Sequence, residues 1–331
     1  MTWFSNFHMT FGCIGTFLNL LLCFLAVFKS PDSIKTYSIL ILNFAVTDLI
    51  SSFMDTVIEL RIIPVGFSVL FMPDGVCTKL GTRVCEIAFS IHLHALTHSL
   101  WSLLLSFSYR YYILHNPSVK RTTLLKTLFL IYLPSLYQAL TYWAEFQQGP
   151  VVERIMKEWY PEYNMSGQYL TGVPNILTFN GLYCSIHLCF PVFPIYCCIG
   201  ILRHKILEHL QKSARSMSKD TRKMHSQLLW VLTLQALLPM SLWIASCTYL
   251  LHAIGWLRGE FYQRIIFCLI HIYPTVGPLT YIVFVRPYRN FCEKIANPRK
   301  VFDERTTGKF TSHDATSTYG QGKNTSVVHP Q

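Results

Sequence analysis

Residues 9–28, MTFGCIGTFLNLLLCFLAVF, form a stretch of 20 residues without a charged side chain. A helix needs about 20 mainly apolar residues to cross the hydrocarbon core of a bilayer. No basic region precedes the stretch, and no small-residue cleavage site marks it as a removable signal peptide. The sequence therefore predicts a membrane-spanning helix that is retained as an anchor.

Six further apolar stretches are long enough to cross the membrane, and they are too long for barrel strands. The whole chain is 51% hydrophobic and only 14% charged, whereas soluble domains carry about 25% charged residues. We therefore expect an all-α membrane protein, a seven-transmembrane helix bundle. Its predicted spans are 9–28, 37–58, 87–109, 124–142, 176–202, 228–251 and 262–285.

The basic residues predict the orientation of this bundle. Of the 28 Lys and Arg residues, 21 lie in the tail or in the loops after spans one, three and five, when Lys126 at the start of span four is counted with its loop. Positive loops stay in the cytoplasm, so the N-terminus is expected outside and the C-terminus inside. Asn164 begins the sequon Asn-Met-Ser in a predicted outer loop and is a glycosylation candidate. The sequon at Asn324 lies in the cytoplasmic tail and should stay unmodified.

The chain divides into a seven-transmembrane domain with the short helix that follows it, residues 1–297, and a polar tail, residues 298–331. The tail has little apolar surface to bury and is expected to be disordered. The net charge of +11 is spread between apolar runs rather than gathered in a basic domain, so we expect no nucleic-acid partner. No phosphate loop, nucleophile elbow or zinc-protease helix is present. We accordingly expect no enzyme activity, no cofactor and no metal.

Ionisable residues inside a span are costly and mark functional candidates. Asp48 lies in the middle of span two, and Asn19 of span one is its expected polar neighbour. The pair can fix helix packing, or it can act as a polar hub that rearranges between two states. Asp55 and Glu59 lie farther out on the same face.

Asp55 and Glu59 can bind a cationic ligand, or they can pair with Arg61 or Arg264. His94 and His98 share a face of span three at the i, i+4 spacing of metal sites, but no carboxylate or thiol completes a ligand set there. A polar lining of the bundle cavity and plain packing are the other interpretations of the two histidines. These four side chains are the candidate ligand-pocket residues.

Cysteines in the predicted outer loops are limited to Cys77 and Cys85, where oxidation is possible. A local bridge between them, free thiols, and a bridge from Cys85 to Cys184 all remain open. A short amphipathic helix is predicted from 288 to 295, with Phe291 and Ile295 facing lipid. Its Cys292 is either a palmitoylation site or an unmodified cysteine.

Four motifs, taken in order, resemble those of rhodopsin-like seven-helix receptors. They are Gly15 with Asn19, the string NFAVTDLI from Asn43, the triplet Tyr109-Arg110-Tyr111, and Gly277-Pro278-Leu279-Thr280-Tyr281. The third resembles the Asp/Glu-Arg-Tyr triplet, with tyrosine in place of the acid. The fourth is similar to Asn-Pro-x-x-Tyr, with glycine in place of asparagine. The loop 143–175 contains no cysteine, so the usual bridge from the third helix to that loop cannot form there.

Tyr-Arg-Tyr, the cysteine-free loop and the ending Val285-Arg286-Pro287-Tyr288-Arg289 resemble the nematode chemoreceptor (Str) superfamily, and its serpentine receptor class delta (Srd) in particular. This resemblance implies a G-protein-coupled chemosensory receptor for a small odorant or pheromone-like ligand, placed in the plasma membrane, as in a sensory cilium. It implies a heterotrimeric G protein as partner. It also implies a switch formed by Tyr109, Arg110, Tyr111, Pro278 and Tyr281.

Two alternatives accompany that interpretation. A channel or transporter should show paired inverted halves, into which seven spans do not divide, and a membrane enzyme should show a catalytic motif. Arg110 can also be a plain anchor at the inner leaflet, because Arg is common at span ends.

Overall fold

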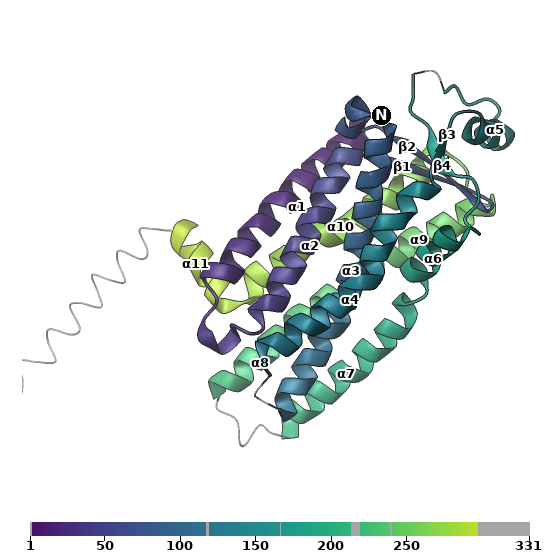
Figure 1. Ribbon diagram of the computed structural model, residues 1–331. Helices are drawn as coiled ribbons and strands as arrows, with labels where there is room; N and C mark the ends of the chain where they lie inside the picture. The colour runs from purple at the N-terminus through teal and green to yellow at the C-terminus, as the bar shows by residue number, and fades with distance from the viewer. Residues whose placement is uncertain (1, 117–118, 166, 213–218, 239, 297–331) are drawn as a thin grey trace, which may run out of the picture.

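The computed structural model describes residues 2–116, 119–165, 167–212, 219–238 and 240–296 (Figure 1). Long helices form a bundle, and each predicted span coincides with one of them or with a consecutive pair. The helices are α1 Thr2–Phe28, α2 Ser38–Ile58, α3 Thr82–His115, α4 Arg121–Thr141, α5 Pro150–Trp159, α6 Phe179–Cys189, α7 Val192–Lys212, α8 Lys219–Leu237, α9 Met240–Ala253, α10 Glu260–Phe284 and α11 Arg286–Ala296. The predicted disordered tail and Asn324 lie outside the described residues.

Five helical stretches in the described part of the chain are long and apolar enough to cross a membrane, which makes the chain a multi-pass membrane protein. They are Trp3–Phe28, Ser38–Ile58, Arg121–Glu145, Phe179–Lys212 and Glu260–Phe284. The two other predicted spans coincide with α3 and with the α8–α9 pair. α3 has 34 residues, but many buried Ser, Thr and His side chains make it less apolar.

Proline divides the fifth predicted span into two helices. α6 ends at Cys189 and α7 begins at Val192, with Pro191 between them. A proline has no N–H to donate and its ring clashes with the preceding turn, which accounts for the interruption. α8 and α9 similarly flank Pro239, which lies outside the described residues.

A four-stranded antiparallel sheet caps one end of the bundle, so the expectation of an all-α fold is wrong at this point. The strands are β1 Leu60–Val65, β2 Ser68–Pro73, β3 Gln147–Gln148 and β4 Thr171–Val173, in the order β1-β2-β4-β3. In Figure 1 the sheet lies beside the N-terminus, at the end of the bundle away from α11. Gly66 has φ +58° at the β1–β2 turn, a conformation that favours glycine.

The sheet is a layer between the bundle and helix α5. Side chains alternate across a strand, and one face of the sheet packs on the bundle through Leu60, Ile62, Val69 and Phe71, which join Phe89 and Phe267 in one apolar cluster. The opposite face packs on Val152 and Met156 of α5, through Ile63, Val65, Leu70 and Met72. Both faces of the hairpin are therefore buried, which is why it stays in place over the bundle.

Glycines bring α1 close to its neighbours. A Cβ at Gly12 would lie 1.8 Å from Thr56 Oγ1 of α2. A Cβ at Gly15 would lie 2.6 Å from Ser52 Oγ and 3.0 Å from Thr275 Oγ1 of α10. Small residues at helix interfaces let backbones approach in membranes, and here they pack α1, α2 and α10 around a set of polar side chains.

Candidate functional site

The half of the bundle next to the sheet contains a buried carboxylate that three helices surround. Asp55 of α2 is fully buried, and its Oδ2 lies 2.9 Å from His8 Nδ1 of α1 and 3.2 Å from His271 Nδ1 of α10. His8 Nε2 also lies 3.5 Å from Cys268 Sγ. Neither histidine stood among the sequence candidates, although both are ionisable residues within or next to a predicted span.

The expected pairing of Asp55 and Glu59 with arginines is wrong. Asp55 has the two histidines as partners, and Glu59 accepts a hydrogen bond of 2.7 Å from Ser5 of α1. Glu59 ends α2 with φ +44°, which turns the chain into β1. The two acids thus join α2 to α1 and α10 rather than to the loops.

Arg61 and Arg264 instead hold the sheet end of the bundle together. Arg61 of β1 donates to Gln263 at 2.7 Å and to the Tyr163 hydroxyl at 2.7 Å, and it lies 3.4 Å from Glu260. Arg264 of α10 binds Glu260 at 2.8 Å and Asp74 at 2.9 Å. These contacts tie the hairpin, the loop after α5 and the start of α10 into one network.

His252 at the end of α9 extends the network to the sixth span. Its Nδ1 lies 3.0 Å from the Pro64 carbonyl of β1, and its Nε2 lies 3.3 Å from the Tyr160 hydroxyl. The Pro64 carbonyl can only accept, so Nδ1 carries the hydrogen, and Nε2 accepts a hydrogen bond from the Tyr160 hydroxyl. Burial raises the pKa of Tyr160. The tip of the hairpin reaches the same helix, because Gly66 N–H donates to the Ala253 carbonyl at 3.1 Å.

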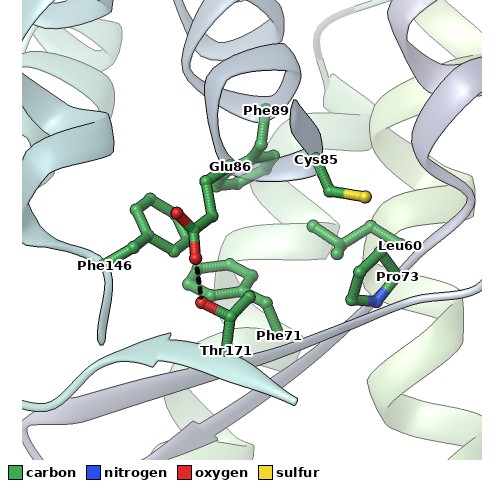
Figure 2. Close-up of a pocket in the computed structure, with 8 residues that line it drawn as sticks. All are labelled: Leu60, Phe71, Pro73, Cys85, Glu86, Phe89, Phe146 and Thr171. Atoms are coloured by element: carbon green, nitrogen blue, oxygen red, sulfur yellow. Dashed lines mark hydrogen bonds between the residues drawn. The ribbon is translucent and has the colours of Figure 1, made fainter. Parts of the chain in front are cut away.

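Glu86 in the first turns of α3 attaches the sheet to the bundle, as Figure 2 shows. Its Oε1 accepts hydrogen bonds from Thr171 at 2.5 Å and from Gln148 at 2.7 Å, and its Oε2 lies 2.7 Å from Arg83. The cavity beside it measures about 10 Å³, which is the room of a single water molecule. This space is too small for a ligand, so Glu86 has a structural place beneath the sheet.

The two candidate histidines of α3 pack toward α4 rather than toward Asp55. The rings of His94 and His98 stack at 5.9 Å, and each meets Tyr132 edge-on, at 4.6 and 5.0 Å. His98 Nε2 lies 3.0 Å from Asn43 Oδ1 of α2. The arrangement favours packing with hydrogen-bonded imidazoles over a cavity lining.

Asp48 and Asn19 lie at the middle of the bundle but contact different partners. Asp48 Oδ1 accepts a hydrogen bond of 3.2 Å from Ser99 of α3, and the Ser99 hydroxyl lies 2.6 Å from that of Tyr273. Asn19 donates to the Pro274 carbonyl of α10 at 3.0 Å, so the expected Asn19–Asp48 contact is replaced by contacts of each residue with a different partner. Asn19 links α1 directly to α10, whereas Asp48 links α2 to α3 and reaches Tyr273 of α10 through Ser99.

The motif Gly277-Pro278-x-x-Tyr281 lies on α10 against these residues. A Cβ at Gly277 would lie 3.0 Å from Asp48 Oδ2, which is closer than ordinary contact. Glycine in place of asparagine thus lets the carboxylate approach the α10 backbone. Pro278 is inside the helix, and Tyr281 is fully buried with its ring 6.2 Å from that of Phe44.

Arg110 lies at the opposite end of the bundle from the sheet and is only 3% exposed. Its guanidinium lies 3.9 Å from the centre of the Tyr37 ring, and Tyr37 also stacks with Tyr109 at 5.9 Å. Within the described residues, Arg110 Nε and Nη2 have no hydrogen-bond partner. In the described residues, an aromatic ring therefore covers the charge, and these two nitrogens have no acceptor.

Two further candidates lie at this end. The Tyr111 ring has the Lys205 ammonium of α7 at 5.8 Å from its centre. Helix α11 confirms the short helix predicted after span seven, but Phe291 packs on α1, with the Lys29 ammonium 4.5 Å from its ring centre. Ile295 is 65% exposed. Burial raises the pKa of the half-buried Cys292 thiol, so the uncharged thiol dominates at neutral pH.

The remaining candidates lie at the sheet end of the bundle. Cys77 and Cys85 form a disulfide with a Cα–Cα distance of 5.2 Å, which joins η2 Val76–Leu80 to α3. Cys184 is a buried thiol that receives a hydrogen bond from Gln138, so it is not the partner of Cys85. Asn164 is exposed in the loop after α5.

Comparison with known proteins places nearly the whole chain in one family. The family model described as "Serpentine type 7TM GPCR chemoreceptor Srd" matches residues 4–294. The chain is 41% identical over 310 residues to serpentine receptor class delta-18 of Caenorhabditis elegans, covering 92% of each protein. It is 41% identical over 322 residues to serpentine receptor class delta-19 (94% of this chain, 95% of the relative) and 32% identical over 287 residues to class delta-3 (84% and 83%), both of the same nematode.

Proposed function

Because this chain belongs to the Srd family of serpentine chemoreceptors, we propose that it binds a small external odorant or pheromone-like ligand and signals to a heterotrimeric G protein. The family makes it a chemosensory receptor of the G-protein-coupled type. We further propose that the chain crosses the membrane seven times, with its N-terminus outside the cell and its C-terminus inside. It places the receptor in the plasma membrane, for instance that of a sensory cilium.

The buried Arg110 is the observation that carries the coupling proposal. A guanidinium is always charged and has five N–H donors, yet two of its nitrogens lack partners in the described residues while Tyr37 covers its face. A buried donor without an acceptor is costly. In this resting arrangement, the N–H groups of Arg110 can therefore still bind an acceptor. When the inner ends of the helices separate, Arg110 turns toward carbonyls at the C-terminal end of a G-protein helix, where the helix dipole is negative.

The other candidate residues position Arg110 or connect it to the rest of the bundle in this proposal. Tyr109 and Tyr111 flank Arg110, while Pro278 and Tyr281 place the inner part of α10 beside α2. Asp48 and Asn19 connect α2 and α1 to α10, so they form the hub through which a change in the outer half reaches Arg110. Ligand binding in the outer half, near Asp55 and Glu59, biases the two-state bundle.

Replacing Arg110 by lysine tests the coupling role. Lysine reaches the membrane interface equally well but lacks the planar fork that several acceptors require. We expect Arg110→Lys to reach the surface and bind ligand while losing signalling, and Arg121→Lys, on the exposed first turn of α4, to signal normally. Wild-type efficacy of Arg110→Lys at equal surface density would make Arg110 an anchor.

Epitope tags test the orientation independently. Outer loops hold seven of the basic residues and the inner side 21, so we expect a tag before Met1 to stain on intact cells and a tag after Gln331 to stain only after permeabilisation. Reversed staining would overturn the proposed orientation and every role that depends on it.

A further inference from the structure

Two imidazoles meet one carboxylate oxygen in the outer half of the bundle. His8 Nδ1 and His271 Nδ1 lie 2.9 and 3.2 Å from the same Oδ2 of Asp55. The three side chains are at most 3% exposed, and they come from α1, α2 and α10. Asp55 Oδ1 is buried without a hydrogen-bond partner in the described residues. The site therefore has a carboxylate with a free acceptor atom, next to two groups that take up protons.

Proton counting defines the possible charges of this triad. A neutral imidazole carries one N–H and one acceptor nitrogen, so two neutral imidazoles beside an ionised Asp55 give a net charge of −1. One more proton gives zero and a second gives +1. A net charge is costly in a buried place, which favours the state that contains one extra proton.

We propose that His8, Asp55 and His271 form a binding site for a single external proton, which strengthens the contact among α1, α2 and α10. The other titratable groups beside the triad in the described residues are His92 of α3, which binds Ser51 at 3.3 Å, and Cys268 of α10, which lies 3.5 Å from His8. The charged groups one turn farther out already have partners: Glu59 with Ser5, Arg264 with Glu260 and Asp74, and Arg61 with Gln263, Tyr163 and Glu260.

The packing around the triad explains how the binding of a proton affects the packing of the whole bundle. His271 is followed one turn later by Thr275, whose Oγ1 lies 3.4 Å from His271 Nε2. Thr275 in turn lies against Gly15 of α1. Loss of the proton leaves an uncompensated charge between closely packed helices. Separation of these helices lowers the cost of burying that charge. Acidity then favours the packed form, and alkaline conditions loosen it.

Thermal unfolding of the purified full-length receptor, with protons as the only added ligand, tests the site. Asp55→Asn keeps the shape of the side chain but removes the charge that binds the proton. We expect the unfolding midpoint of the wild type to rise relative to that of Asp55→Asn as the pH falls from 9 to 6.5. The ratio of their folding constants should change by up to about tenfold per pH unit for one linked proton. His204→Gln, an exposed histidine of α7, should follow the wild type.

A second variant and a cellular experiment complete the test. If Asp55→Asn does not fold, His8→Gln should flatten the profile in the same pH window. Parallel profiles of wild type and triad variants would overturn the proposal. External access rests on the proposed orientation, so basal signalling is also recorded at external pH 6 and 8 with the cytosol held constant. A response to external acid supports both claims, whereas a response to cytosolic acid alone keeps the site and overturns the orientation.

Discussion

Removing the ring that covers Arg110 should raise the signalling of the receptor in the absence of ligand. Tyr37 is 3% exposed, and its ring lies 3.9 Å below the Arg110 guanidinium. Tyr37→Leu keeps an apolar side chain of moderate size in the buried position but removes the π face. The resting arrangement loses its contact with the charge, while the active arrangement, in which Arg110 has turned away, loses nothing.

The structure gives the expected size of the effect. A desolvated cation–π contact is worth about 2 kcal/mol, and about 1.4 kcal/mol corresponds to a tenfold change in an equilibrium constant. If the whole contact belongs to the resting state, Tyr37→Leu raises the ratio of active to resting receptor about 30-fold. A receptor that rests at about 1% active would then become roughly 20–25% active without ligand.

Basal cAMP or calcium signalling, normalised to surface density, measures this change. Tyr37→Phe is the matched control, because the Tyr37 hydroxyl has no hydrogen-bond partner in the described residues and the ring is kept. We expect Tyr37→Phe to behave as the wild type. Basal signalling of Tyr37→Leu at the wild-type level would refute the idea that the ring restrains Arg110. Equal activation by both variants would assign the restraint to the hydroxyl.

Two further predictions concern the ends of the bundle. Cys85→Ser should lower the free energy of unfolding by about 2–3 kcal/mol, because the bridge to Cys77 closes a loop with a sequence separation of 8; an unchanged unfolding midpoint without reductant would show that the bridge adds nothing. Cys292→Ser should abolish acyl-exchange labelling, since the thiol lies on α11 at the proposed inner surface; unchanged labelling would remove the lipid and leave the helix.

Hydropathy predicted the long helices well, because a continuous apolar run of about 20 residues has few other uses. Hydropathy did not predict the sheet, because its strands are not long apolar runs of this kind. Leu60–Val65 and Ser68–Pro73 are short apolar segments next to a span, and their burial on both faces removes the alternation that indicates a strand. Their partner, Thr171–Val173, is about 100 residues away in the sequence, so no local signal joins them.

The sequence identified several residues of the site, but it did not identify the residues that they contact. Asp48, Asp55 and Arg110 stand out because charged groups in a span are costly. Their partners come from other helices, and sequence spacing does not give the rotation of one helix against another. Tyr37 lies at the start of a span and has no unusual chemistry, while His8 precedes the first predicted span. Only the packing of α1, α3 and α10 around α2 reveals what these two residues touch.

The contacts of the β1–β2 hairpin with α9 have a mechanical consequence. Gly66 binds Ala253, and Pro64 binds His252, so the end of α9 next to the hairpin is held in place. Helix α9, Met240–Ala253, has 14 residues, which is about 21 Å of helix. A tilt of about 10° around the held end moves the other end of α9 by roughly 4 Å over this length. The hairpin thus acts as the pivot for any tilt of α9, and the movement of the far end depends on the hairpin staying fixed.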